Sequence, residues 1–190
     1  MTRRTFASLV LAIGLFGCDS GEAESQVGSD VDADEQDRVR VALVELGELA
    51  AWTVLDASED PLADHRPDLV DCPVGAWATE FGQLEVQTGV CNYLALATPT
   101  LLALAPGDRV IVDLWHDTLD APTPASGHVA VLLGGALVGE AEVVIPSAAA
   151  VFRFELEIDE PVPAGTPVVL HLHNHGFNAW TFVNLDAETS

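Results

Sequence analysis

The chain has 190 residues, of which 49% are hydrophobic and 19% charged, and this composition fits one compact domain with its own core. Its 30 acidic residues face only seven basic ones, all arginines, which gives a formal net charge of -23 at pH 7. Such a charge repels a phosphate backbone and excludes nucleic acid as a partner. Beyond the N-terminus the longest apolar run, residues 129–138, contains two glycines and is too short to span a bilayer.

The first residues have the layout of an export signal. Arg3 and Arg4 precede an apolar stretch at residues 6–16, which is followed by Gly17 and Cys18. Residues 15–18, Leu-Phe-Gly-Cys, resemble the lipobox of a bacterial lipoprotein precursor. The resemblance implies a signal peptide over residues 1–17 and a lipid on the Cys18 thiol, which would anchor the chain to a membrane of the cell envelope, on the periplasmic or the cell-surface face. A signal that is cleaved without lipidation is the alternative.

The same segment raises the question of the export route. Residues 2–6, Thr-Arg-Arg-Thr-Phe, are similar to the twin-arginine motif, whose pathway exports folded proteins. An ordinary Sec signal that happens to contain two arginines is the other interpretation. Either route leads to an exported protein.

An acidic segment follows the predicted signal. Between Asp19 and Asp37 the chain has eight acidic residues, no basic one and almost no large apolar side chain. Such a stretch cannot bury enough surface to offset the entropy of ordering, and its charges repel one another. The sequence therefore predicts a tether over residues 18–40 and one folded domain over residues 41–190.

Two further cysteines, Cys72 and Cys91, remain once Cys18 is assigned to the lipid. In an exported protein, thiols that meet in space are normally oxidised, so we expect a Cys72–Cys91 disulfide. A thiolate metal site is the weaker interpretation, because the close Cys-x-x-Cys spacing is missing.

The domain has the rhythm of an all-β protein. At residues 151–158 Phe152, Phe154 and Leu156 alternate with charged residues, and at residues 108–116 Val110, Val112 and Leu114 do the same. Segment 35–49 fits either a helix or a first strand. The pattern predicts an antiparallel β-sandwich of about nine strands. The other expected strands are 49–55, 76–79, 84–88, 91–97, 128–133, 137–145, 168–175 and 180–185.

The order of these segments also carries a resemblance. Residues 82–88, 107–115 and 167–185 resemble the matching strands of jelly-roll domains of the galactose-binding-like and carbohydrate-binding-module type, over about residues 48–186. The resemblance implies a jelly-roll-like sandwich and, by analogy of fold, a role in binding sugars.

One set of outward side chains suits such a role. Strand alternation turns Arg109, Asp113 and Trp115 to one face, and Asn178 and Trp180 follow in a later segment. An aromatic ring flanked by planar polar groups can stack on a sugar ring and bind its edge. These residues predict a non-catalytic module that binds a glycan or another polar surface ligand. A solvated sheet face with a structural or protein-contact role is the alternative, with an envelope protein as partner.

Histidines form the second set. His171, His173 and His175 lie two residues apart on a predicted strand and therefore share a face, and imidazole nitrogen is a ligand for zinc and copper. We expect His175 or His116 to complete a zinc or copper site with His171 and His173, and Asp117 or His128 is another source of a ligand. Solvated polar histidines are the alternative interpretation.

The sequence contains none of the usual catalytic patterns. Neither a Gly-x-Ser-x-Gly elbow, nor a His-Glu-x-x-His helix, nor a P-loop occurs. We therefore expect a binding protein rather than an enzyme.

Overall fold

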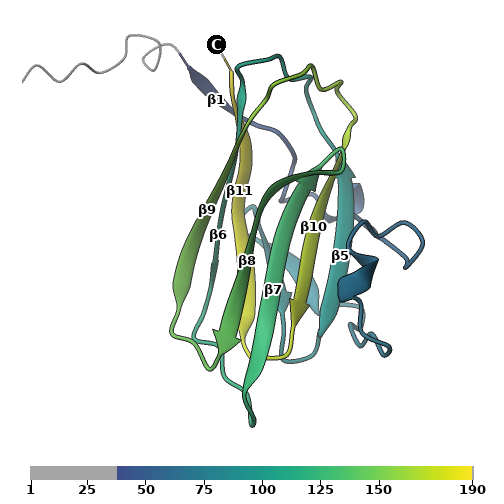
Figure 1. Cartoon of the computed structure of the whole chain (residues 1–190), viewed down its shortest axis with the longest axis vertical. Helices are drawn as coiled ribbons and strands as arrows, with labels where there is room; N and C mark the ends of the chain where they lie inside the picture. The colour runs from purple at the N-terminus through teal and green to yellow at the C-terminus, as the bar shows by residue number, and fades with distance from the viewer. Residues whose placement is uncertain (1–37, 190) are drawn as a thin grey trace, which may run out of the picture. The chain divides into compact units, whose positions relative to one another are not determined.

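The computed structural model describes residues 38–189, so that Cys18, the predicted signal peptide and nearly all of the predicted tether lie outside the described residues. Residues 38–189 form a β-sandwich of two antiparallel sheets (Figure 1), which confirms the predicted all-β, jelly-roll-like class. The described part has eleven strands rather than about nine. One reason is that Val39–Ala42, in the segment that fitted either helix or strand, forms the short strand β1.

Sheet A has six strands in the order β3-β4-β11-β6-β9, and β1 also pairs with β11. On one side, the long C-terminal strand β11 pairs with two different strands. Its first four residues pair with β4, and its last four pair with β1. The bounds are β3 Trp77–Glu80, β4 Gln83–Gln87, β6 Arg109–His116, β9 Ala150–Glu157 and β11 Ala179–Thr189.

Sheet B has five strands in the order β2-β5-β10-β7-β8. Its bounds are β2 Thr53–Val54, β5 Tyr93–Pro99, β7 Ala125–Leu133, β8 Ala136–Ile145 and β10 Pro167–Asn174. The expected strand at residues 49–55 is mostly irregular: only Thr53 and Val54 pair with β5, whereas Leu49–Ala51 form the 3-10 turn η2. β10 is the central strand and is paired on both sides.

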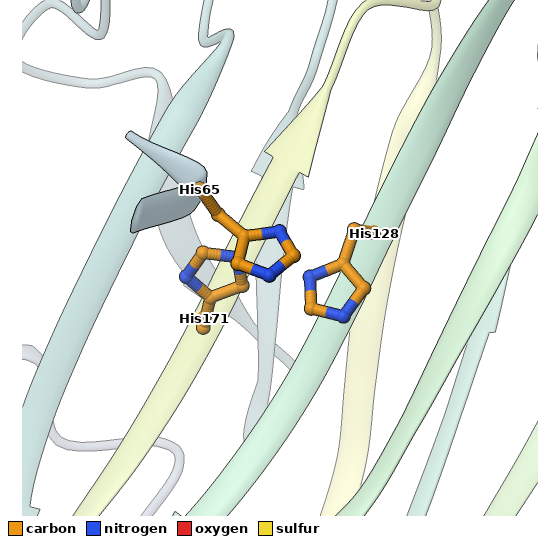
Figure 2. A group of neighbouring side chains, drawn as sticks. All are labelled: His65, His128 and His171. Carbon is orange, nitrogen blue, oxygen red and sulfur yellow. The ribbon is translucent and has the colours of Figure 1, made fainter. Parts of the chain in front are cut away.

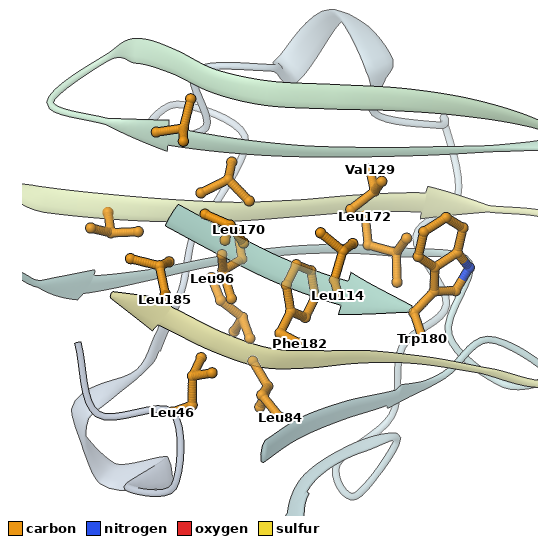
Figure 3. Packing of buried hydrophobic residues seen from close by; sticks show 14 of the residues in the cluster. Leu46, Leu84, Leu96, Leu114, Val129, Leu170, Leu172, Trp180, Phe182 and Leu185 are labelled. Carbon is orange, nitrogen blue, oxygen red and sulfur yellow. The ribbon is translucent and has the colours of Figure 1, made fainter. Parts of the chain in front are cut away.

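The core lies between the two sheets and follows from the alternation of side chains. Leu114 of β6, Leu170 and Leu172 of β10, and Phe182 of β11 all point inward and are almost fully buried (Figure 3). Each such side chain contributes about 1.5–3 kcal/mol by leaving water. The two patterns that were clearest in the sequence, at residues 108–116 and 151–158, form β6 and its neighbour β9 at the edge of sheet A.

A second apolar cluster covers the other side of sheet B. We call residues 56–76 the covering loop; its side chains Leu62 and Val70 pack on the outer face of sheet B. The 3-10 turn η3, Ala63–His65, lies within this loop. The buried members of this cluster are Leu55, Tyr93, Ala95, Ala130, Leu132 and Val169.

Several bonds hold the covering loop to the sheet. The predicted disulfide is confirmed: Cys72 of the loop is bonded to Cys91, two residues before the start of β5. Asp60, almost fully buried, accepts a hydrogen bond from the hydroxyl of Tyr93 and pairs with Arg66 at 3.4 Å. The Arg66 guanidinium also lies 5.0 Å from the centre of the Tyr93 ring. Sheet B therefore carries a fixed layer of chain on its outer face.

The two sheets also meet at one side, where the edge strands β8 and β9 lie next to each other (Figure 1). A Cβ atom at Gly139 of β8 would lie 2.3 Å from Cγ of Phe154 of β9. The absence of a side chain at residue 139 is what admits the aromatic ring of β9. Among residues 38–189, no helix has the length and apolar character needed to cross a bilayer.

Candidate functional site

The outer face of sheet A carries part of the predicted ligand row. Arg109, Asp113 and Trp115 point outward from β6 and are each half-buried, whereas Ile111, on the same face between Arg109 and Asp113, is buried. Trp115 pairs across the sheet with Thr181 of β11 and with Val151 of β9, which is 81% exposed. One side of this tryptophan therefore borders open sheet surface.

Ion pairs order the polar groups next to Trp115. Arg40 of β1 donates to Asp113 at 2.9 Å and to Asp186 at 2.7 Å. On the other side of Asp113, Arg153 of β9 lies 3.4 Å from its carboxylate. Sequence reasoning did not include Arg40, because β1 reaches this face only through its pairing with β11.

The other two predicted ligand residues do not belong to this face. Trp180 is fully buried, its ring is stacked on Phe152, and its Nε1 donates to Asn174 at 3.3 Å, so the prediction that it contacts a ligand is wrong. The physical reason is register: Trp180 pairs with His116, and both side chains point into the core. Asn178 is exposed in the turn before β11, where its amide donates to the Thr118 carbonyl at 3.0 Å.

The predicted histidine set is also divided between the sheets. His171 and His173 lie on the outer face of sheet B, and His175 follows directly after β10. His116 is on sheet A, is fully buried, and alternates in phase with the apolar residues of β6. Its Nδ1 lies 2.6 Å from the Asp117 carbonyl oxygen. The prediction that His116 completes the set is therefore wrong.

Different histidines meet those of β10. His128 of β7 pairs with His173 across the sheet, and its ring centre lies 5.1 Å from that of His171. His65 of the covering loop stacks on His128 with ring centres 4.3 Å apart. Figure 2 shows His65, His128 and His171 converging from η3, β7 and β10, and one ring nitrogen of each lies within 4.8 Å of the others. The sequence indicates His128 as a possible metal ligand, but it does not indicate His65.

Nothing periodic in the sequence marks His65, because it sits in an irregular loop rather than on a strand. The available signal was the expected disulfide. Cys72 ties the segment that contains His65 to the start of β5, and β5 lies beside the strand that carries His171. The expected disulfide therefore indicates that the segment containing His65 lies near the outer face of sheet B.

Burial controls the chemistry of these rings. His171 is 0% exposed, and neither of its ring nitrogens has a hydrogen-bond partner. Burial and, after it, repulsion from the neighbouring imidazoles lower the pKa of His171 to about 3. The same causes lower the pKa of His173 to about 4. Both rings are therefore neutral at neutral pH and offer a free lone pair.

A surface hollow with a volume of about 480 Å³ opens beside the cluster. Its rim includes the carboxylates of Glu140 and Glu142 on β8. His128 Nε2 lies 3.2 Å from Glu140 Oε2. The remaining lining residues are His65, Ser126, Ala141, His173 and His175.

Comparisons with known proteins place the chain by fold. No protein-family model and no curated protein matches it. Among solved structures, the mannan-recognising carbohydrate-binding module TmCBM27 matches with a TM-score of 0.50 and 10% identity, over 80% of this chain and 99% of that chain. A module specific for non-crystalline cellulose, CBM28, matches with a TM-score of 0.47 and 10% identity, over 78% and 94% of the two chains.

An adhesin domain of Lys-gingipain is also similar in fold. The K1 cleaved adhesin domain of Lys-gingipain from Porphyromonas gingivalis matches with a TM-score of 0.42 and 17% identity, over 80% of this chain and 98% of that chain. At such identities the likeness is one of fold. The chain therefore has the sandwich fold seen in the mannan-recognising module.

Proposed function

We propose that this chain is a non-catalytic module that binds carbohydrate on the outer face of sheet A. The observation that carries the proposal is the position of Trp115, half-buried on an open sheet face at the end of a row of ordered polar side chains. A sugar ring has an apolar face that stacks on an aromatic ring, and hydroxyl groups at its edge that need hydrogen-bond partners.

The ion pairs beside Trp115 suit the edge of a sugar. Asp113 is held between Arg40 and Arg153, and Asn184 accepts a hydrogen bond from Arg40 at 3.0 Å. Side chains that are already fixed lose little conformational entropy when a ligand binds. This face therefore offers fixed donors and acceptors next to a stacking surface.

The likeness of fold indicates which glycan to test first. TmCBM27 recognises mannan, and its fold extends over four-fifths of this chain. Stacking on a single tryptophan contributes about 0.5–1.5 kcal/mol, so we expect weak binding of a monosaccharide and measurable binding only of a polymer that also contacts the polar row.

We further propose that the module acts outside the cytoplasm, anchored to the cell envelope through a lipid on Cys18. The signal-like N-terminus and the lipobox-like residues 15–18 support this proposal. The Cys72–Cys91 disulfide also fits an exported protein. Mass spectrometry of the protein from bacterial membranes tests it: we expect diacylglycerol on Cys18, and an unmodified Cys18 thiol would contradict the anchor.

Affinity electrophoresis in gels that contain mannan or non-crystalline cellulose tests carbohydrate binding. We expect retardation of the wild-type chain and a loss of at least about tenfold in affinity for Trp115→Ala, which corresponds to about 1.4 kcal/mol. Phe81→Ala is the matched control, since Phe81 is a fully exposed aromatic residue in the β3–β4 turn, away from the row. Equal retardation of wild type and Trp115→Ala, or no binding across a wider polysaccharide panel, would overturn the proposal.

A further inference from the structure

We propose that His65, His128 and His171 bind one transition-metal ion, zinc or copper, on the outer face of sheet B. This inference does not depend on carbohydrate binding, because the three histidines and Trp115 lie on different sheets.

The first argument is convergence from three parts of the chain. Three separate elements, η3, β7 and β10, each contribute one imidazole, and one nitrogen of each ring lies within 4.8 Å of the others (Figure 2). Ligand nitrogens on tetrahedral zinc lie about 2.0–2.1 Å from the metal and therefore roughly 3.3 Å from one another. In the structure the His65 ring is stacked on that of His128 with the two ring planes 15° apart, so the in-plane lone pairs of these rings do not point at one ion. Binding requires the His65 side chain to turn out of this stack, and it is free to do so because it is the exposed member of the three and lies on the turn η3.

The second argument is that several buried imidazole nitrogens of the cluster have no hydrogen-bond partner. Both nitrogens of the fully buried His171 and the Nδ1 atom of His128 have no hydrogen-bond partner. Buried polar atoms in native proteins are nearly always paired, so unpaired nitrogens gathered on neighbouring rings indicate room for a ligand. A metal ion supplies a partner for one lone pair on each ring.

Glu140 adds to this argument because it selects the free nitrogen of His128. Its carboxylate lies 3.2 Å from Nε2, and a proton on Nε2 donated to Glu140 leaves the lone pair on Nδ1. Nδ1 is the unpaired, buried atom of that ring. A carboxylate behind a ligating histidine in this way fixes the ring and makes it a better ligand.

The third argument concerns charge and access. The hollow beside the cluster gives an ion a route from solvent, and it leaves room for water at a fourth position. The net charge of -23 and the rim carboxylates of Glu140 and Glu142 attract cations to this opening.

Calorimetric titration of the chelator-stripped full chain with zinc, and then with copper, tests the proposal. We expect one ion per chain with micromolar or tighter affinity and a rise in melting temperature for at least one of the two metals. His65→Ala and His171→Asn should each weaken binding at least a hundredfold. Because His65 is exposed on a loop, His65→Ala keeps the test valid even where His171→Asn impairs folding.

The controls separate the site from the acidic surface. His116→Gln changes a histidine of sheet A and should leave the stoichiometry and affinity unchanged. Magnesium, which prefers oxygen ligands, should give no saturable binding at the same ionic strength. No saturable binding of zinc or copper, or equal binding by wild type and His65→Ala, would overturn the proposal and leave the carbohydrate proposal standing.

Discussion

The two outer faces of the sandwich differ although both are built by the same alternation of side chains. On sheet A the outward residues Arg109, Asp113 and Trp115 are partly exposed to solvent, and Arg109 and Asp113 form ion pairs. On sheet B the outward residues His171 and Tyr93 are almost fully buried, because the covering loop packs over them. Strand alternation thus tells which residues point outward, but not whether they are exposed. Their exposure depends on whether another segment of the chain packs over them.

This difference changes the chemistry of the polar groups. Exposed charges on sheet A stay hydrated and form pairs that contribute little to stability. On sheet B, burial lowers the pKa values of His171 and His173. By burying His171, the covering loop therefore keeps its imidazole neutral and without a hydrogen-bond partner.

Removing the disulfide should produce the largest change, because it releases the layer that makes the two faces different. Cys72→Ser combined with Cys91→Ser opens a loop with a sequence separation of 19 and should lower the free energy of unfolding by about 3 kcal/mol. Urea unfolding of the variant and of the oxidised wild type measures this difference.

The loosened loop should also expose the second apolar cluster and raise the binding of a hydrophobic dye. An unchanged urea midpoint and unchanged dye binding would show that the remaining bonds of Asp60, Arg66 and Tyr93 hold the covering loop without the disulfide.

The second-largest change should come from acid, which lowers the free energy of unfolding through the buried His171. In the metal-free native protein His171 stays neutral down to about pH 3, whereas in the unfolded chain it takes up a proton near pH 6.5. Because the unfolded state binds this proton first, stability falls as the pH drops below about 6.5, by about 2 kcal/mol at pH 5. Urea unfolding at pH 8 and pH 5 with a chelator should show a smaller pH dependence for His171→Asn than for wild type.

Wild type and His171→Asn contain the same carboxylates, so the contribution of carboxylate titration to the pH dependence is the same in both. The difference between the two proteins therefore reports on His171. Identical pH dependence in wild type and His171→Asn would mean that the buried ring accepts a proton in the folded state.

A substitution on the exposed outer face of sheet A should change the free energy of unfolding least. Arg40→Gln removes the cation that joins Asp113 and Asp186, and we expect a loss of about 1 kcal/mol or less, since these groups are partly exposed. Screening by 1 M salt should reduce the difference between variant and wild type, whereas the effect of the disulfide should not depend on salt. A loss above about 2 kcal/mol that persists in high salt would contradict the distinction between the faces.

The sequence was sufficient for the fold because period-two patterns mark strands in both sheets, the edge strand β9 as well as β6 and β10, which are paired on both sides. Val110, Val112 and Leu114, or Val168, Leu170 and Leu172, can be buried together only on a strand. The short strands β1 and β2 depend on pairing with distant partners, so local pattern resolved them poorly.

The site was harder to predict for a related reason. Alternation correctly joined His171 with His173, and Arg109 with Trp115, but it carries no information on contacts between strands. The placement of Trp180 and His116 in the core depends on which face of β6 and β11 meets sheet B. The convergence of His65 with His128 depends on the path of a loop, which tertiary bonds fix rather than local propensity.

The contact between Gly139 and Phe154 bears on how the protein behaves at high concentration. The strands β8 and β9 end their sheets, and a free edge is a template on which another chain can add a strand. Here the ring of Phe154 enters the space that a side chain at residue 139 would fill, and this brings the two edges together. Charged residues at 153, 155 and 157 alternate along β9. An approaching strand would meet charged side chains and a closed corner, so the sandwich resists edge-to-edge aggregation at this side.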